Sequence, residues 1–289
     1  MFLIISEFFL LMYILLCVAL YFLQDKLIFV PKIKIVASPN DYGIDFENVY
    51  FPSQDDMLHG YYVRNQTKKL NDHNVTFFNP NDFTIFYCHG NAGNVSYRSS
   101  QIKMYYDLGF NVFVFDYSGY GQSSGKPSAE TIEQNTIDAW KYLTTQKNIS
   151  SNKIIVVGRS LGGFAALTAA EKFSPFALSL ESTFSSIKNI AQHQMPIFPA
   201  FLILKNNFDN VKKIKKIKVP LFIVHSKEDN IVKYYHSQKL LKAAKNNKEI
   251  PKISFKSFIG GHNGCYEIVE NHYPEEFFSF FKNIYENRN

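Results

Sequence analysis

Cysteine is scarce in this chain of 289 residues, which contains only Cys17, Cys88 and Cys265. Three cysteines are too few for a disulfide framework, and their spacing does not match a metal site. Cys265 lies three residues after His262, but its surroundings do not resemble the signature of a cysteine enzyme. The sequence also lacks a phosphate-binding loop, a dinucleotide fingerprint and an arginine-rich stripe. We therefore expect no metal, no cofactor and no nucleic-acid partner.

Charge of neither sign dominates the chain. The net charge is +6, and 46% of the residues are hydrophobic. This composition excludes a disordered chain, and the small positive excess does not require a polyanionic partner. The length is enough to bury a substantial core.

One long hydrophobic run is present, at the N-terminus. Residues 8–22 contain no charged side chain. About twenty apolar residues cross a bilayer, so residues 2–23 can span it with Glu7 near an interface. A cleaved signal peptide is the main alternative, but no small-residue cleavage site follows the run and no basic residue precedes it. We expect an uncleaved, single-pass anchor over residues 1–23, a connector over 24–45, and a folded domain over 46–289.

The sequence gives conflicting signals for the side of the membrane. Lys26, Lys32 and Lys34 follow the apolar run, and by the positive-inside rule they favour a cytoplasmic domain. Four N-glycosylation sequons would instead suit a luminal domain, at Asn65, Asn74, Asn94 and Asn148. The orientation is therefore left open here.

Beyond the anchor, short β-branched and aromatic runs alternate with helical patterns. We expect strands over residues 46–51, 58–63, 84–88, 112–115, 154–157, 177–180, 219–224 and 253–258. Helices are expected near 99–108, over 128–145, after residue 160 and over 275–285. This alternation predicts an α/β fold with a mainly parallel eight-stranded sheet and helices on both faces. Ligands of such sheets bind at the carboxyl ends of the strands.

A serine at a tight turn is the first candidate catalytic residue. Gly158, Ser160 and Gly162 form a G-x-S-x-G pattern between an expected strand and an expected helix. A nucleophilic serine at such a turn has strained backbone angles, and glycines two residues away on each side let the chain segments pass closely. The sequence therefore predicts that Ser160 is a nucleophile.

A serine hydroxyl needs a general base, which in turn needs a carboxylate to hold its tautomer. His262, in the glycine-flanked loop after the last strand, is the predicted base. Asp229, after the seventh strand, is the favoured carboxylate, with Glu228 and Glu181 as alternatives. Two other histidines near strand ends, His89 and His225, are expected to be structural.

An attacked carbonyl develops negative charge and needs aligned N–H donors. The backbone N–H of Leu161, at the start of a helix, is one expected donor. The loop after Cys88 is expected to supply the second N–H donor. Asn91 is the favoured residue, and Ala92 is the alternative. These residues would form an oxyanion hole.

Several motifs together resemble the α/β-hydrolase superfamily and, within it, the Bem46-like proteins. The matching segments are QDKLIFVP at 24–31, HGNAGN at 89–94, FDYSGYGQSSG at 115–125, GRSLGG at 158–163, ESTFSSI at 181–187 and GGHN at 260–263. They cover nearly the whole chain in family order. The chain is most similar to the subgroup with a spanning leader, because it lacks a cysteine-rich palmitoylated N-terminus. It departs from the family at Ser118, where arginine is usual, and at Val232-Lys233, where a proline is usual.

The resemblance implies a Ser160–His262–Asp229 triad and an oxyanion hole from Leu161 and Asn91. It also implies hydrolysis of acyl esters or thioesters through an acyl-enzyme, with lipid-modified protein cysteines as one substrate class. A short cap at about 185–218 would select the substrate. Two alternatives stay open, a peptidase or amidase of the same fold and a catalytically silent membrane scaffold.

Overall fold

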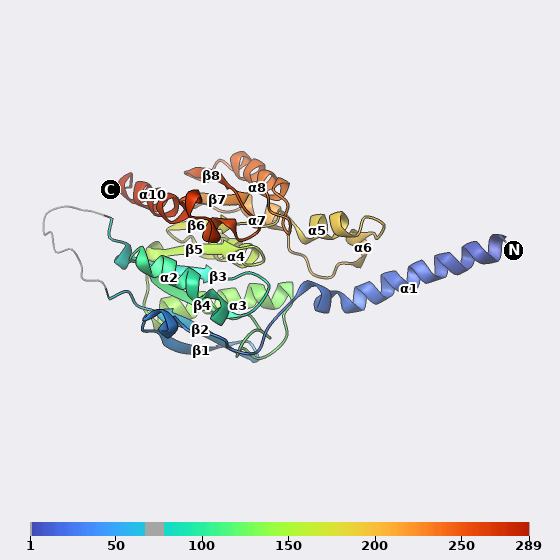
Figure 1. Ribbon diagram of the computed structural model, residues 1–289, viewed down its shortest axis with the longest axis horizontal. Helices are drawn as coiled ribbons and strands as arrows, with labels where there is room; N and C mark the ends of the chain where they lie inside the picture. The colour runs from blue at the N-terminus through green and yellow to red at the C-terminus, as the bar shows by residue number, and fades with distance from the viewer. Residues whose placement is uncertain (1, 67–77, 289) are drawn as a thin grey trace, which may run out of the picture.

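The computed structural model describes residues 2–66 and 78–288 of the chain. Within them, eight strands form one sheet in the order β1-β2-β4-β3-β5-β6-β7-β8 (Figure 1). Strands β1 and β2 pair antiparallel with each other, β2 is antiparallel to β4, and the remaining neighbours are parallel. The strands are β1 (Glu47–Ser53), β2 (Asp56–Val63), β3 (Thr84–Cys88), β4 (Asn111–Phe115), β5 (Ile154–Arg159), β6 (Ala177–Glu181), β7 (Leu221–Ser226) and β8 (Ile253–Phe258). The predicted α/β class and mainly parallel sheet are confirmed.

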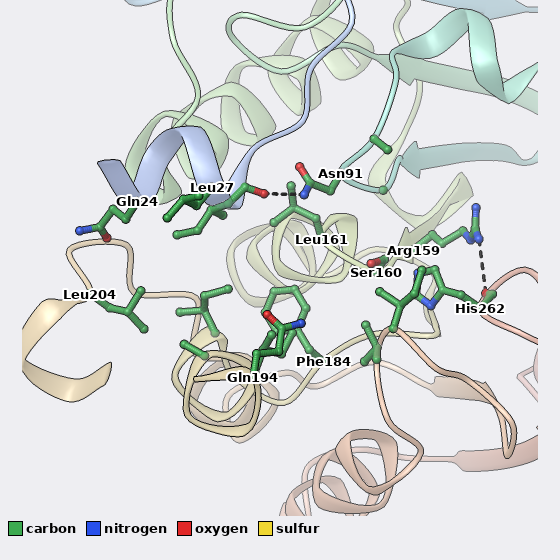
Figure 2. A pocket seen from close by; sticks show the side chains of 18 of the residues that line it. Gln24, Leu27, Asn91, Arg159, Ser160, Leu161, Phe184, Gln194, Leu204 and His262 are labelled. Atoms are coloured by element: carbon green, nitrogen blue, oxygen red, sulfur yellow. Dashed lines mark hydrogen bonds between the residues drawn. The ribbon is translucent and has the colours of Figure 1, made fainter. Parts of the chain in front are cut away.

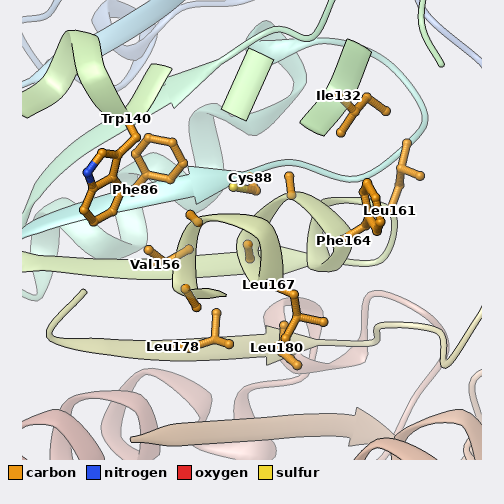
Figure 3. Packing of buried hydrophobic residues seen from close by; sticks show 14 of the residues in the cluster. Phe86, Cys88, Ile132, Trp140, Val156, Leu161, Phe164, Leu167, Leu178 and Leu180 are labelled. Carbon is orange, nitrogen blue, oxygen red and sulfur yellow. The ribbon is translucent and has the colours of Figure 1, made fainter. Parts of the chain in front are cut away.

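Helices cover both faces of the sheet. Alternate strand residues point to opposite faces, so Phe86 and Val156 join one apolar cluster while Ile85 and Val157 join the other. The first cluster includes α3 (Ala129–Lys141), α4 (Gly162–Phe173) and α8 (Tyr235–Asn246). Figure 3 shows α4 lying across the central strands in this cluster. The second cluster includes α2 (Ser99–Asp107) and α10 (Tyr273–Glu286).

The observed element boundaries differ from the expected ones where proline or local geometry intervenes. Strand β7 begins at Leu221 rather than at residue 219, because Pro220 has no N–H for the ladder. Helix α3 begins after Ser128, whose side chain accepts a hydrogen bond from the N–H of Thr131. It ends at Lys141 and continues as a wider π-type turn to Gln146.

The N-terminal helix is longer than the predicted anchor. Helix α1 (Phe2–Ile28) continues past residue 23 because nothing in the next residues breaks a helix until Pro31, whose ring disfavours a helical residue before it. Most of its side chains are exposed and apolar, and it is long and apolar enough to cross a membrane. Figure 1 shows it projecting from one end of the globular domain.

The segment after α1 is packed against the globular domain. Phe29 and Ile44 are buried. The Gly93 N–H donates to the Val30 carbonyl at 3.3 Å, and the Lys32 N–H donates to the Gly93 carbonyl at 3.2 Å. The expected connector therefore runs along the loop that follows β3.

The segment between β6 and β7 contains the cap. It holds α5 (Ile187–Gln194), α6 (Ala200–Ile203) and α7 (Asn210–Ile214). Figure 1 shows α5 and α6 projecting beyond the sheet toward α1, and α6 contacts α1. In contrast, Ile214 of α7 is part of the main apolar core.

Burial restricts the predicted glycosylation sites. Asn65 is 3% exposed and Asn94 is fully buried, and both side-chain amides donate to backbone carbonyls. Neither can carry a glycan in the folded domain. Asn148 is exposed, whereas Asn74 lies outside the described residues.

Candidate active site

Ser160 lies at a strained turn between β5 and α4. Its φ is +52°, in the left-handed region that non-glycine residues rarely adopt. The Ser160 N–H donates to the Glu181 carbonyl at 2.9 Å, which ties the turn to the neighbouring strand β6. Strain of this kind persists only where the surroundings enforce it, and it is common at functional sites. The half-buried Ser160 side chain faces a cavity.

The two motif glycines allow this turn to pack. A Cβ at Gly158 would clash with the Ala166 Cβ, and a Cβ at Gly162 would clash with the Cys88 carbonyl oxygen. The second contact is with backbone, which cannot rotate away. Glycine at residue 162 therefore lets α4 begin directly beside β3.

We expect Gly162→Ala to lower the free energy of unfolding by at least about 2 kcal/mol, because the new methyl group forces β3 and α4 apart. Gly261→Ala is the matched control, since a Cβ there meets nothing within 4 Å. Urea denaturation in detergent micelles measures both variants. Equal stability of the two variants would contradict this account of the turn.

Asp229 and His262 are in direct contact. The His262 Nδ1 lies 2.7 Å from the Asp229 Oδ2. Because an ionised carboxylate only accepts hydrogen bonds, Nδ1 carries the proton and a neutral His262 keeps Nε2 as its acceptor. The N–H groups of Ile231 and Val232 donate to the other carboxylate oxygen, at 2.9 and 2.8 Å.

A second histidine contacts the same carboxylate. The Nε2 of His225 donates to the Val232 carbonyl at 2.7 Å and lies 3.3 Å from the Asp229 Oδ2. Burial alone would raise the pKa of Asp229, but the hydrogen bonds from His225 and His262 outweigh it and hold the pKa well below its ordinary value. Asp229 is therefore ionised at neutral pH and can stabilise a positively charged His262.

The two alternative carboxylates are engaged elsewhere. Glu181 is fully buried and accepts hydrogen bonds from the hydroxyls of Tyr105, Tyr266 and Tyr273. Glu228 accepts a hydrogen bond from the Gly260 N–H at 2.7 Å, which supports the loop that carries His262. Both therefore have structural contacts away from the imidazole.

The expected oxyanion-hole residues lie beside Ser160. Leu161 directly precedes α4, and Leu161, Asn91 and Ala92 all line the cavity that Ser160 faces. Within residues 2–66 and 78–288, the backbone N–H groups of Leu161 and Asn91 have no acceptor. An unpaired donor at a helix start, from Leu161, and a second from the loop after β3, from Asn91, are the arrangement that a developing oxyanion needs.

The side chain of Asn91 has a function that the sequence did not indicate. Its amide donates to the Ile28 carbonyl at 2.5 Å, and its oxygen accepts from the Val30 N–H and from the Tyr120 hydroxyl. The end of α1 is thereby fixed to the loop that carries the candidate oxyanion donor.

Arg159 is a further residue that sequence reasoning missed. It is 5% exposed and donates to the Asn263 side chain and to the His262 carbonyl, the latter at 3.4 Å. Its guanidinium also lies 5.2 Å from the centre of the Tyr266 ring. Arg159 therefore positions the His262 loop, and an arginine directly before the motif serine was the available signal.

The remaining histidine and cysteine candidates have structural environments. His89 is fully buried; its Nδ1 donates to the Gly90 carbonyl at 2.7 Å and its Nε2 lies 3.3 Å from Asp116. Cys265 is buried, and burial raises the pKa of its thiol well above the ordinary value, so the thiolate is disfavoured. Neither residue competes with Ser160 and His262.

His236 holds the start of the cap in its neutral form. Its Nδ1 accepts hydrogen bonds from the Ser185 N–H and hydroxyl, at 3.2 and 2.8 Å. Burial, assisted by Lys239 and His225, lowers the pKa of His236 to about 4. An unfolded histidine has a pKa of about 6.5, so the unfolded chain binds this proton more readily. The contribution of His236 to the free energy of unfolding is thus fully present above pH 6.5 and is lost as the pH falls toward 4.

We expect the wild type to lose more unfolding free energy between pH 7 and pH 5 than His236→Gln does, by about 1–2 kcal/mol. His272→Asn, at an exposed histidine outside the cap, is the control and should retain the wild-type pH dependence. Urea denaturation at the two pH values measures the difference. Identical pH dependence in all three proteins would contradict this assignment.

The candidate catalytic residues open into one large cavity of about 710 Å³. Figure 2 shows it extending from Ser160 and His262 past Leu161 and Phe184 toward Gln24 and Leu204. Among the described residues, no hydrogen bond links Ser160 to His262, a contact that is often loose in the absence of substrate. We find no group of three or more possible metal ligands within the described part of the chain.

Together, the parallel sheet, the serine turn after β5 and the Asp–His pair beyond β7 and β8 define the α/β-hydrolase fold, and the α/β hydrolase fold family profile matches residues 84–202. Protein bem46 of Schizosaccharomyces pombe is 32% identical over 164 residues, covering 56% of this chain and 52% of that protein. The uncharacterized membrane protein YNL320W of Saccharomyces cerevisiae is 28% identical over 257 residues, covering 84% of each. The predicted resemblance to the Bem46-like α/β hydrolases is confirmed.

A solved structure has the same architecture. The Pyrococcus furiosus esterase Pf2001 superimposes with a TM-score of 0.70 at 19% identity, covering 88% of this chain and 98% of the esterase. At this identity the likeness shows the fold alone.

Proposed function

We propose that this protein is a membrane-anchored serine hydrolase that cleaves acyl esters or thioesters. The observation that carries the proposal is the 2.7 Å contact between Asp229 and His262 beside a strained serine in a shared cavity. A structural role alone does not require a serine at positive φ, an oriented histidine and two residues with unpaired backbone N–H groups to line the same cavity. The fold and its esterase neighbour support a hydrolase.

The acylation step uses the three residues in turn. The Ser160 Oγ attacks the acyl carbonyl carbon while His262 Nε2 takes the hydroxyl proton, and Asp229 stabilises the resulting imidazolium. The N–H groups of Leu161 and Asn91 donate to the carbonyl oxygen as it becomes negative. The bond to the leaving oxygen or sulfur then breaks, and His262 returns its proton to the leaving group.

Deacylation repeats these steps with water as the nucleophile. His262 takes a proton from water, hydroxide adds to the acyl-Ser160 carbonyl, and the bond to Ser160 Oγ breaks. His262 protonates the departing Oγ, which releases the carboxylic acid and regenerates the enzyme.

The cavity favours a substrate with an acyl chain. Its lining includes the apolar side chains of Leu161, Phe184, Ile187, Ile190 and Phe198. An apolar cavity of this size can exclude water around a hydrocarbon chain. Together with the Bem46-like resemblance, it supports palmitoyl-protein thioesters as one candidate substrate class.

Membrane attachment by α1 is part of the proposal. The helix has the length and composition of a membrane span, and a relative from yeast is named as a membrane protein. Because Asn65 and Asn94 are buried, the glycosylation argument for a luminal domain weakens. Lys26, Lys32 and Lys34 then favour a cytoplasmic catalytic domain.

Hydrolysis of three substrates that share one acyl group tests the proposed chemistry. The purified full chain is assayed in detergent micelles with three substrates, an octanoyl oxygen ester, an octanoyl thioester and an octanoyl amide. We expect cleavage of the ester and thioester, loss of both activities in His262→Ala, and much slower cleavage of the amide. Preferential cleavage of the amide would favour the peptidase alternative. Absence of all three activities in a folded protein would favour the scaffold.

A further inference from the structure

The catalytic cavity is built partly from the anchor helix. Leu20, Gln24, Leu27 and Ile28 of α1 line the cavity together with Ser160 and His262. Figure 2 shows Gln24 and Leu27 on the side of the cavity away from His262. A helix that served only as a tether would not need to contribute to the substrate cavity.

The cap holds α1 in this position by side-chain and backbone contacts. Gln24, which is 3% exposed, donates to the Ile203 carbonyl at 3.0 Å and accepts from the Lys205 N–H at 2.8 Å. The Asn206 amide donates to Asp25 at 2.6 Å. These contacts, near the interfacial end of α1, fix the rotation of the helix about its axis.

The contact continues along α1 toward the middle of the expected membrane span. The Tyr13 hydroxyl donates to the Ile197 carbonyl at 2.8 Å, and the Tyr13 ring stacks on Phe198 with centroids 5.7 Å apart. At 1.5 Å per residue, Tyr13 lies about 16 Å from Gln24 along the helix axis. If α1 crosses a bilayer, the cap tip beside Tyr13 lies within the hydrocarbon region, which is about 30 Å thick.

The composition of the cap tip fits that location. Residues 195–204 contain no charged side chain. Ile197, Phe201 and Leu202 are 72%, 67% and 69% exposed. Exposed apolar groups of this size are unfavourable in water but favourable in lipid, and they extend the apolar surface of α1.

We propose that the acyl chain of the substrate enters the cavity directly from the bilayer, between α1 and the cap tip, so that the membrane anchor is one wall of the acyl-binding site. This inference rests on the proposed hydrolase function. The substrate class is then a long acyl chain that is already embedded in the membrane, attached through an ester or thioester to a polar group. The polar cavity residues Gln101 and Glu267 belong neither to α1 nor to the cap, and we expect them to lie near the leaving group.

A tryptophan scan on two sides of α1 tests the acyl wall. Leu27→Trp places a large side chain in the cavity lining, whereas Leu15→Trp makes the same change at an exposed position on the opposite face of α1 that does not line the cavity. The full-length proteins are reconstituted in phosphatidylcholine vesicles and assayed with butanoyl and hexadecanoyl thioesters. The measured quantity is the ratio of kcat/KM for the long chain to that for the short chain.

We expect Leu27→Trp to lower this ratio on the order of 100-fold, because each methylene that loses its apolar site costs roughly a fourfold factor in transition-state binding. Leu15→Trp should leave the ratio within about twofold of the wild type. An equal ratio in both variants and the wild type would overturn the inference. If the wild type did not hydrolyse the butanoyl thioester at all, the proposed hydrolase function itself would be wrong.

A fluorescence measurement tests the position of the cap tip independently of activity. The chain has a single tryptophan, the buried Trp140, so Trp140→Phe gives a background into which Ile197→Trp is introduced. We expect lipids brominated on their acyl chains to quench the fluorescence of the Ile197→Trp variant strongly. Asn152→Trp, at an exposed site before β5, is the control and should remain unquenched. Equal quenching of the two variants would overturn the inference.

Discussion

Ser160→Ala should lower kcat by about 10⁴-fold or more, because the attacking oxygen is removed and the remaining site can only assist direct attack by water. The substitution leaves the backbone at residue 160 in the same left-handed conformation, and an alanine tolerates it no worse than a serine. The melting temperature should therefore change little. Steady-state hydrolysis of a short acyl thioester and thermal unfolding measure the two effects separately.

Ser174→Ala is the matched control for this prediction. Ser174 is also a serine at positive φ, with a value of +47°, but it is exposed at the end of α4 and does not line the cavity. It should retain wild-type kcat. If Ser160→Ala kept more than about a tenth of the wild-type rate, Ser160 would not be the nucleophile.

Asp229→Asn should lower kcat by about 10³- to 10⁴-fold with a much smaller effect on KM. An asparagine can occupy the same space, but it cannot stabilise a charged imidazolium, and its amide can turn its N–H₂ toward His262. The turned amide disfavours the tautomer that leaves Nε2 free to accept the Ser160 proton, and the missing negative charge raises the energy of the imidazolium. Initial rates over a range of substrate concentrations separate kcat from KM.

Glu228→Gln provides the comparison for Asp229→Asn. Glu228 is the neighbouring carboxylate and contacts the Gly260 N–H rather than the imidazole. Its replacement should lower kcat by less than about tenfold, since the amide oxygen can still accept that hydrogen bond. A larger decrease in kcat for Glu228→Gln than for Asp229→Asn would indicate that Glu228, rather than Asp229, is the carboxylate that supports His262.

The sheet and the location of the candidate site could be predicted because their signals are local. β-branched and aromatic runs mark buried strands, and parallel strands place their carboxyl ends at one edge, so Ser160, Asp229 and His262 were expected to lie near one another. The structure brings Asp229 into contact with His262 and places Ser160 and His262 on one cavity. Their catalytic roles stay predictions that the substitutions above test.

The remaining features depend on contacts between distant residues. Gln24 meets Lys205, and Asn91 binds the carbonyl of Ile28, pairs separated by 181 and 63 positions in the chain. No helical or strand periodicity encodes such pairs. The sequence did contain one signal for these contacts, the polar pair Gln24 and Asp25 at the end of an apolar helix. Polar side chains in that position need hydrogen-bond partners, either in the protein or at the membrane interface. Helix α1 continues to Ile28, five residues beyond the predicted anchor.

Mapping the adduct of a fluorophosphonate probe tests the central claim most directly. Purified wild type, Ser160→Ala and His262→Ala are incubated with the probe, digested and analysed by mass spectrometry. The account predicts one adduct, on Ser160 of the wild type, formed at least about 100-fold more slowly in His262→Ala, because the serine then lacks its base. An adduct on another residue, or none on folded wild type, would contradict the claim that Ser160 is an activated nucleophile.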